Sequence, residues 1–153
     1  MVGIQGSGKS LLSRWIQQQN AFMMYDIISR DVEKTMKKCL NKMEESLEFG
    51  HNIIIDNTNP TIESRKPYIE LAKKYGYEVK IINIKKMCDD YNMALHNNYY
   101  RHIKCGNPLI PNVALYKFLK DYQKPDFKEG VDDIININYM LPTLNYDYFK
   151  YLY

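Results

Sequence analysis

The chain has 153 residues, of which 45% are hydrophobic and 25% are charged, and its net charge is +3. This is the composition of one ordinary globular domain; it excludes a disordered chain, and the apolar runs are too short for a membrane span. The three cysteines are scattered without a Cys-x-x-Cys pair, which favours reduced thiols in an intracellular protein over a disulfide framework.

The first predicted element is a glycine-rich loop. Residues 3–10 read Gly-Ile-Gln-Gly-Ser-Gly-Lys-Ser, the G-x-x-x-x-G-K-S pattern of loops that bind nucleotide phosphates. In such a loop the backbone N–H groups surround an anion, the lysine contacts the β- and γ-phosphates, and the serine hydroxyl binds Mg²⁺, so Ser10 is the candidate metal ligand. The alternative is an ordinary Gly/Ser-rich turn before a helix. The candidate ATP-binding residues are Gly3, Gln5, Gly6, Ser7, Gly8, Lys9 and Ser10.

Only Met1 and Val2 precede this loop, although a phosphate-binding loop normally follows a buried strand. The first strand of the expected sheet is therefore largely missing from this chain. Three explanations stay open: the sequence is a fragment of a longer protein, its start was assigned too late, or the strand is truly lost.

Helices and strands alternate along the rest of the chain. The predicted helices cover residues 9–19, 31–49, 61–75, 89–103 and 113–122. The predicted strands cover residues 22–28, 52–56, 78–84 and 133–138. This alternation predicts an α/β fold: a parallel sheet of the P-loop kinase type with helices on both faces.

Two helices carry more specific expectations. The buried stripe of helix 9–19 is expected to consist of Leu11, Leu12, Trp15 and Ile16, which recur at helical spacing. Asn112 precedes the helix that begins at Val113, and we expect its side chain to cap that helix.

Two carboxylates are candidate catalytic or substrate-binding groups because they follow predicted strands, where α/β proteins bind ligands. Asp31, next to Arg30, has the chemistry to accept the proton of an attacking hydroxyl, and the alternative is a helix N-cap. Asp56 ends an isoleucine run and suits either Mg²⁺ binding through water or contact with the acceptor; the alternative is an Asx turn.

Cations near these carboxylates have two interpretations. Arg101, or Lys104 as a second choice, could bring positive charge over the phosphates from a mobile segment, and the alternative is a solvated helix end. A row at i, i+4 and i+8 on helix 31–49 would either follow a phosphate backbone or simply face solvent. This row consists of Lys34, Lys38 and Lys42.

Together these segments resemble the kinase domain of polynucleotide 3′-phosphatase/5′-hydroxyl kinases. The resemblance is carried by the loop at 3–10, Ser29-Arg30-Asp31, Asp56-Asn57-Thr58-Asn59-Pro60 with Ser64-Arg65, His96-Asn97-Asn98 with Arg101, and Ile110-Pro111. It extends to about Tyr139, so we expect one such domain over residues 1–140 and a Tyr-rich tail over 141–153.

The resemblance implies an enzyme that uses ATP and Mg²⁺ to phosphorylate 5′-hydroxyl ends of DNA or RNA, an activity of nucleic-acid repair. It implies that Asp31 is the general base, Lys9 a phosphate contact and Arg101 the lid arginine. The residues implied to contact the substrate are Arg30, Lys34, Asp56 and Thr58. It also implies a nucleic-acid partner, no membrane, and a location in the cytoplasm or nucleus.

Two other functions stay open. The same scaffold could phosphorylate a small-molecule or protein hydroxyl, although the Asp-Asn-Thr-Asn-Pro segment argues against this. Alternatively, an incomplete sheet would leave an inactive nucleotide-binding remnant. The sequence contains no Asp-x-Asp-Gly motif, so we expect no 3′-phosphatase activity from these residues.

Overall fold

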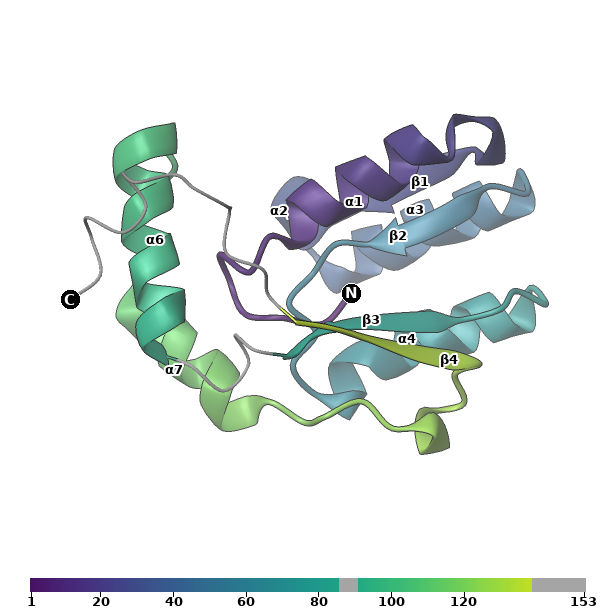
Figure 1. Ribbon diagram of the computed structural model, residues 1–153. Helices are drawn as coiled ribbons and strands as arrows, with labels where there is room; N and C mark the ends of the chain where they lie inside the picture. Colours follow the sequence, from purple (N-terminus) through teal and green to yellow (C-terminus); the bar gives the residue numbers. More distant parts are fainter. Residues whose placement is uncertain (86–90, 139–153) are drawn as a thin grey trace.

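The computed structural model describes residues 1–85 and 91–138, in which strands and helices alternate (Figure 1). The strands are β1 (Tyr25–Ile28), β2 (Asn52–Ile55), β3 (Lys80–Ile84) and β4 (Asp133–Ile137). The helices are α1 (Lys9–Gln19), α2 (Arg30–Glu33), α3 (Met36–Glu48), α4 (Ile62–Lys74), α6 (Tyr91–Cys105) and α7 (Asn112–Asp121), with short 3₁₀ turns η1 (Ala21–Met23) and η2 (Phe127–Glu129). The expected tail at 141–153 lies outside the described residues.

The strands form two parallel pairs, which confirms the α/β class predicted from the sequence. β1 pairs with β2, and β3 pairs with β4. Of the residues that the structure describes, Met1 and Val2 lie between the pairs, and Val2 forms a parallel bridge to Asn83 of β3. The centre of the sheet therefore holds a bridge, in agreement with the expectation that the first strand is largely missing from these residues.

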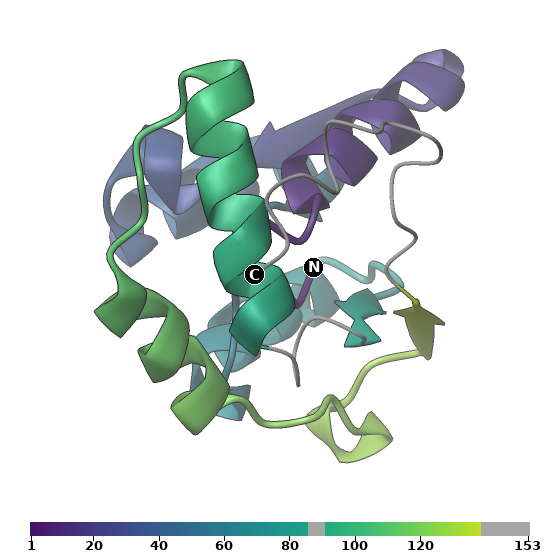
Figure 2. The same ribbon diagram turned by 60° about the vertical axis from the view of Figure 1, so that its left-hand side comes forward.

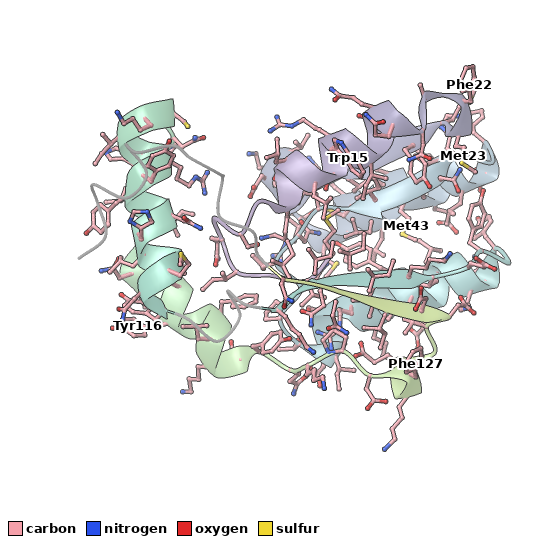
Figure 3. All side chains as sticks on the ribbon, in the orientation of Figure 1. Trp15, Phe22, Met23, Met43, Tyr116 and Phe127 are labelled. Atoms are coloured by element: carbon pink, nitrogen blue, oxygen red, sulfur yellow. The ribbon has the colours of Figure 1, made fainter. Side chains whose placement is uncertain are left out.

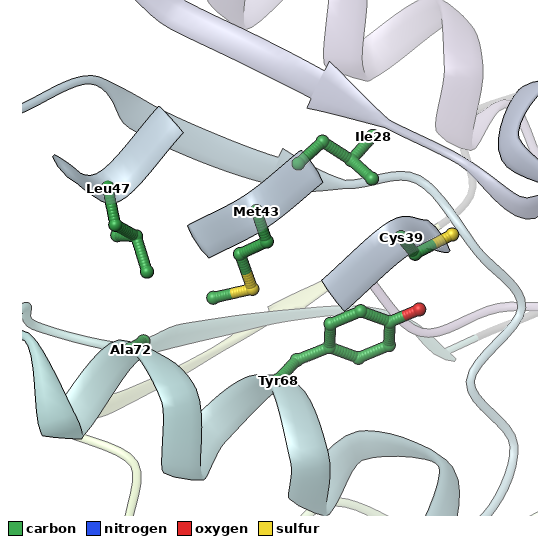
Figure 4. Packing of buried hydrophobic residues seen from close by; sticks show 6 residues of the cluster. All are labelled: Ile28, Cys39, Met43, Leu47, Tyr68 and Ala72. Atoms are coloured by element: carbon green, nitrogen blue, oxygen red, sulfur yellow. The ribbon is translucent and has the colours of Figure 1, made fainter. Parts of the chain in front are cut away.

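Helices cover both faces of the strands, as predicted. In Figure 1, α1 lies in front of β1, whereas α3 and α4 lie behind the strands. Six buried residues fill the space among β1, α3 and α4 (Figure 4): Ile28, Cys39, Met43, Leu47, Tyr68 and Ala72. Each large apolar side chain in such a cluster contributes about 1.5–3 kcal/mol through burial, so this cluster is a main source of stability on that face.

A second cluster joins the phosphate loop to α6 and α7. Ile4 of the loop is fully buried against Ala94 of α6 and against Leu115 and Phe118 of α7. Figure 2 shows α6 and α7 together beside the start of the chain. The loop is thus fixed by apolar packing before any ligand is considered.

The prediction for the buried face of α1 is wrong for two of its four residues, whereas Leu12 and Ile16 are half-buried. Leu11 is 70% exposed and Trp15 is 56% exposed, whereas Lys9 and Ser13 are buried. Lys9 directs its side chain into the preceding loop, and Ser13, four residues later on the same face, bonds the Lys9 carbonyl. The loop therefore determines which side of α1 faces inward. Trp15 and the fully exposed Phe22 appear as labelled side chains in Figure 3.

The single helix predicted over 31–49 is two helices. Ser29 caps α2 by accepting a hydrogen bond from the Val32 N–H, and Thr35 caps α3 by accepting one from the Lys38 N–H. Lys34 lies between them with φ of 67°, a conformation that ends a helix for a residue with a Cβ. The two N-caps therefore mark the starts of two separate helices.

This break corrects two expectations. Lys34 does not share a helix face with Lys38 and Lys42, so the predicted basic row does not form. Asp31 is not an N-cap, because Ser29 has that role.

Two further predictions need correction at element ends. The strand expected over 22–28 begins only at Tyr25, because residues 21–23 form a 3₁₀ turn. Asn112 is the first residue of α7, and its neighbour Pro111 occupies the N-cap without a side-chain hydrogen bond. Proline is compatible with this position because it has no N–H that would need a partner.

Candidate phosphate-binding and catalytic site

The glycine-rich loop forms a closed turn before α1. Gly6 and Gly8 have φ of 80° and 84°, in the left-handed region that favours glycine. A Cβ at Gly3 would lie 2.8 Å from the Ser7 Oγ, so a larger residue there would displace the Ser7 side chain. The turn depends on these glycines.

Lys9 points into this turn. Its side chain is 8% exposed, and its Nζ donates to the Ile4 carbonyl at 2.7 Å and to the Ser7 Oγ at 3.4 Å. Ser10 is exposed in the first turn of α1. A buried ammonium and a helix N-terminus both favour an anion at the same place. The arrangement fits a bound phosphate.

Two neighbouring segments hold the loop in place. The Gly3 N–H donates to the Thr58 carbonyl at 3.1 Å, and the Asn97 Nδ2 donates to the Gly6 carbonyl at 3.3 Å. Asn98 holds the chain after α6, because its side chain bonds both the N–H and the carbonyl of Ile110. The Asp-Asn-Thr-Asn-Pro and His-Asn-Asn segments, far apart in sequence, thus meet at the loop.

Gln5 shows how enclosed the loop is. Its Oε1 is buried and has no hydrogen-bond partner among the described residues. Buried polar atoms are normally paired. An unpaired acceptor beside a phosphate-binding turn is consistent with a site built to receive a ligand or its waters.

Asn57 connects the ends of β1 and β2. Its Oδ1 accepts the Arg30 N–H at 2.7 Å, and its Nδ2 donates to the Tyr68 hydroxyl at 3.1 Å. Burial raises the pKa of Tyr68 well above its usual value, so this hydroxyl stays neutral. Asn57 therefore positions the first turn of α2, which carries Asp31. This role of Asn57 is not evident from the sequence, where its signal is an amide directly after a buried strand.

Asp56 and Thr58 lie at the carboxyl end of β2 and are half-buried. The Asp56 N–H bonds the Ile28 carbonyl, which extends the ladder to β1 by one residue. The Asp56 carboxylate lies near the Met1 amino group and favours its protonated form. Thr58 reaches the loop through its backbone carbonyl rather than its side chain.

Asn59 and Arg65 of the same motif have structural roles. Asn59 has φ of 45° and its Nδ2 donates to the Met1 carbonyl at 3.0 Å. Arg65 donates to the carbonyls of Asn59 and Pro60 and forms two hydrogen bonds to the Glu129 carboxylate, at 2.7 and 2.8 Å. Both side chains of this ion pair are 3% exposed.

Asp31, Arg30 and Lys34 lie together around α2 at the carboxyl edge of β1. Asp31 and Arg30 are exposed, and the Lys34 Nζ donates to the Asp31 backbone carbonyl. Arg101 is half-buried on α6, one turn after Asn97, so both residues are on the same side of that helix. The side chains of Asp31 and Arg101 form no hydrogen bond or ion pair with the described residues.

A glycine turn with a buried lysine, opening a helix on a parallel α/β scaffold, defines the class: this is a P-loop fold of the kinase type. No family model matches the chain. It is 33% identical over 134 residues, 88% of its length, to the "Bifunctional polynucleotide phosphatase/kinase" of Schizosaccharomyces pombe. It is 33% identical over 141 residues, 91% of its length, to the "Putative bifunctional polynucleotide phosphatase/kinase" of Acanthamoeba polyphaga mimivirus.

The chain is therefore homologous to part of the bifunctional polynucleotide phosphatase/kinases, which confirms the resemblance seen in its motifs. It spans about a third of the length of these relatives, 31% and 32%. A more distant relative is the "6-phosphofructo-2-kinase/fructose-2,6-bisphosphatase" of Aquarana catesbeiana, 26% identical over 154 aligned positions that cover 81% of this chain. Among the described helices, none is both long and apolar enough to cross a bilayer.

Proposed function

We propose that this chain phosphorylates the 5′-hydroxyl ends of DNA or RNA, with ATP as the phosphoryl donor. The observation that carries the proposal is the similarity to two polynucleotide phosphatase/kinases over about nine-tenths of the chain. The loop geometry supports it independently, because it fits the phosphates of a nucleotide. Restoring 5′-phosphates would serve nucleic-acid repair.

On the donor side, ATP when bound supplies the γ-phosphoryl group, and Mg²⁺ offsets its negative charge. The residues that would hold it are those of the loop: its backbone N–H groups would face the phosphates, and the Lys9 ammonium, which donates to the Ile4 carbonyl, would contact them instead. The Ser10 hydroxyl, exposed at the start of α1, is the group available to Mg²⁺.

On the acceptor side, the Asp31 carboxylate accepts the proton of the 5′-hydroxyl as that oxygen attacks. Arg30, Lys34, Asp56 and Thr58 are the proposed contacts to the nucleic acid end. They are grouped at the carboxyl ends of β1 and β2, as expected for a ligand site in a parallel sheet. Arg101 would stabilise the charge that develops on the transferred group.

A kinase for a small-molecule hydroxyl is the competing function, and the relative from Aquarana catesbeiana is the observation that favours it. That relative is less similar and aligns with a smaller share of the chain than the polynucleotide enzymes. The two functions are distinguished by acceptor: labelled γ-phosphate should pass to an oligonucleotide with a 5′-hydroxyl and not to a sugar phosphate.

The test of the mechanism is Asp31→Asn. We expect kcat for oligonucleotide phosphorylation to fall by about 10²–10⁴-fold, because the general base is lost, with ATP affinity unchanged. The matched control is Glu33→Gln, which neutralises the other acidic residue of α2 and should leave kcat nearly intact. Full activity of Asp31→Asn, or an equal loss in both variants, would remove Asp31 from this role.

A further inference from the structure

The side chain of Asn97 holds one peptide group of the phosphate-binding loop. Its Nδ2 donates to the Gly6 carbonyl at 3.3 Å, and the N–H of the same peptide group, which belongs to Ser7, donates to the Ile4 carbonyl at 3.2 Å. In a trans peptide the C=O and N–H groups point in opposite directions. The peptide between Gly6 and Ser7 is therefore restrained at both ends, with its carbonyl turned toward α6.

The loop needs a restraint at this peptide. Gly6 has φ of 80°, and glycine adopts positive and negative φ about equally readily, so its own preference does not fix the peptide that follows. Anion-binding loops work by presenting N–H groups, and a carbonyl oxygen rotated toward a phosphate would repel it. A donor that holds the Gly6 carbonyl on the α6 side prevents this rotation.

The helix packs directly on the backbone of the loop, which makes the restraint rigid. A Cβ at Gly6 would lie only 3.4 Å from the Asn97 Cβ and 3.9 Å from the Asn97 carbonyl carbon. One turn earlier in α6, Ala94 packs with Ile4 in a fully buried contact (Figure 2). Asn97 is 5% exposed, so its bond to the loop is shielded from water and strengthened by the low local dielectric.

The same side of α6 carries Arg101. Along this side, Ala94 meets Ile4 and Asn97 meets Gly6, and Arg101 follows one turn later. One turn advances about 6 Å along the helix axis. The distance of the guanidinium from the loop is therefore determined by the contact at Asn97.

Burial of α6 ends at this turn. Asn98 is fully buried, whereas Tyr99 and Ile103 are 39% and 52% exposed. Asn98 bonds the backbone of Ile110 and not the loop. Of the two adjacent buried amides, Asn97 is thus the one that joins the loop to the part of α6 that carries Arg101.

We propose that Asn97 is a positioning residue that couples the phosphate-binding loop to the arginine of α6. Its amide keeps the Gly6–Ser7 peptide in the orientation that admits a phosphate, and it holds Arg101 at a fixed distance from that phosphate. The link to Arg101 rests on the proposed kinase function, whereas the restraint on the loop does not.

The first test measures the loop in the full chain without any phosphoryl transfer. Asn97→Leu keeps a branched side chain and removes the donor, and Asn98→Leu is the matched control at the adjacent buried amide. Amide exchange at Ser7 should become about 10-fold faster in Asn97→Leu and stay unchanged in Asn98→Leu. The dissociation constant of the β,γ-imido analogue of ATP should rise by about 10-fold in Asn97→Leu alone. Asn97→Ala and Asn98→Ala are measured alongside, so that a leucine variant that fails to fold does not decide the result.

The second test measures the link to Arg101. With saturating ATP and an oligonucleotide that has a 5′-hydroxyl, Asn97→Leu should lower kcat by about 10-fold, because the guanidinium is displaced. In the Arg101→Ala background the same change should lower kcat by less than about 2-fold, since two residues that act through one interaction are not additive.

Each part of the proposal has a result that would overturn it. Equal acceleration of Ser7 exchange at the two positions, or unchanged affinity of the Asn97 variants for the ATP analogue, would overturn the restraint on the loop. Losses of kcat that multiply in the double variant would overturn the link to Arg101. Failure of the unmodified chain to phosphorylate any 5′-hydroxyl would instead contradict the proposed function, and the exchange and affinity measurements would still decide the role of Asn97.

Discussion

At the scale of single residues, the amide of Asn57 is the link between the strand-end motif and the candidate base. It accepts the Arg30 N–H and donates to the Tyr68 hydroxyl, a residue of the main apolar cluster. Through these two hydrogen bonds, Asn57 fixes the start of α2 relative to the buried cluster. Because Asn57 bonds both the first turn of α2 and a buried hydroxyl, it influences the position of Asp31 without taking part in the proposed chemistry itself.

Asn57→Ala tests this positioning role. Loss of both hydrogen bonds should destabilise the fold by about 1–3 kcal/mol, and kcat should fall by about 10-fold while KM for ATP is unchanged, because the loop is not touched. Asn57→Asp keeps the acceptor for Arg30 and should restore part of kcat. The exposed Asn41→Ala is the control in urea unfolding and steady-state assays. Unchanged kcat in Asn57→Ala would limit Asn57 to stability.

Arg101 gives a second prediction at this scale. It is half-buried one turn after Asn97, which contacts the loop. Arg101→Ala should lower kcat by about 10²-fold or more with little change in ATP affinity, because its charge is needed only as the phosphoryl group moves. Lys104→Ala, on the exposed end of α6, serves as comparison. A larger loss of kcat in Lys104→Ala than in Arg101→Ala would indicate that Lys104, and not Arg101, stabilises the developing charge.

At the scale of elements, the Arg65–Glu129 pair joins α4 to η2 and to the segment that carries Asn59. The guanidinium satisfies the carbonyls of Asn59 and Pro60 with one nitrogen and the carboxylate with its others. Glu129 also accepts the Asp126 N–H and so closes the turn before β4. One buried ion pair therefore fixes three segments.

Removal of one partner of this pair should be strongly destabilising. Glu129→Gln leaves the buried Arg65 charge uncompensated, and we expect a loss of about 3–5 kcal/mol in the free energy of unfolding, measured in urea. The exposed pair of Lys66 and Glu70 on α4 provides the control: Glu70→Gln should change stability by less than about 1 kcal/mol. Equal effects in the two variants would show that burial of the Arg65 pair is not maintained in solution.

At the scale of the whole molecule, two parallel strand pairs meet across an apolar cavity that holds the Met1 amine. Burial lowers the pKa of this amine from 8.0 to about 5, more than the nearby Asp56 carboxylate raises it; Lys9 and Arg65 lower it further. Below about pH 5 the folded chain must hold a charge in the cavity. Above pH 8 the amine is neutral in both folded and unfolded chains.

Stability should therefore rise as the pH increases from about 5 to 8. In this window the unfolded chain binds more protons than the folded chain, so the free energy of unfolding increases, by at most about 4 kcal/mol. Chemical denaturation at several pH values measures the slope. The Nα-acetylated chain is the control, because its histidines titrate unchanged but its amine does not. Identical slopes for both forms would contradict the burial of the Met1 amine in the folded chain.

The local pattern of the sequence was sufficient for most elements. The isoleucine runs predict β2 and β4, because such a signal depends only on neighbours in the chain. The phosphate-binding loop at 3–10 is predictable for the same reason, since the spacing of its glycines and lysine is itself a local signal. Homology then confirmed the family resemblance, whereas the roles of Asp31, Arg101 and the substrate contacts stay predictions.

Long-range contacts decided what the sequence could not. Leu11 and Trp15 have the spacing of a buried stripe, but α1 turns Lys9 and Ser13 inward because the loop that precedes it needs the lysine. Arg65 meets Glu129 from 64 positions away. Sequence periodicity specifies which residues share a face, but only the packing of distant segments determines where that face points, which polar groups pair and which space stays open.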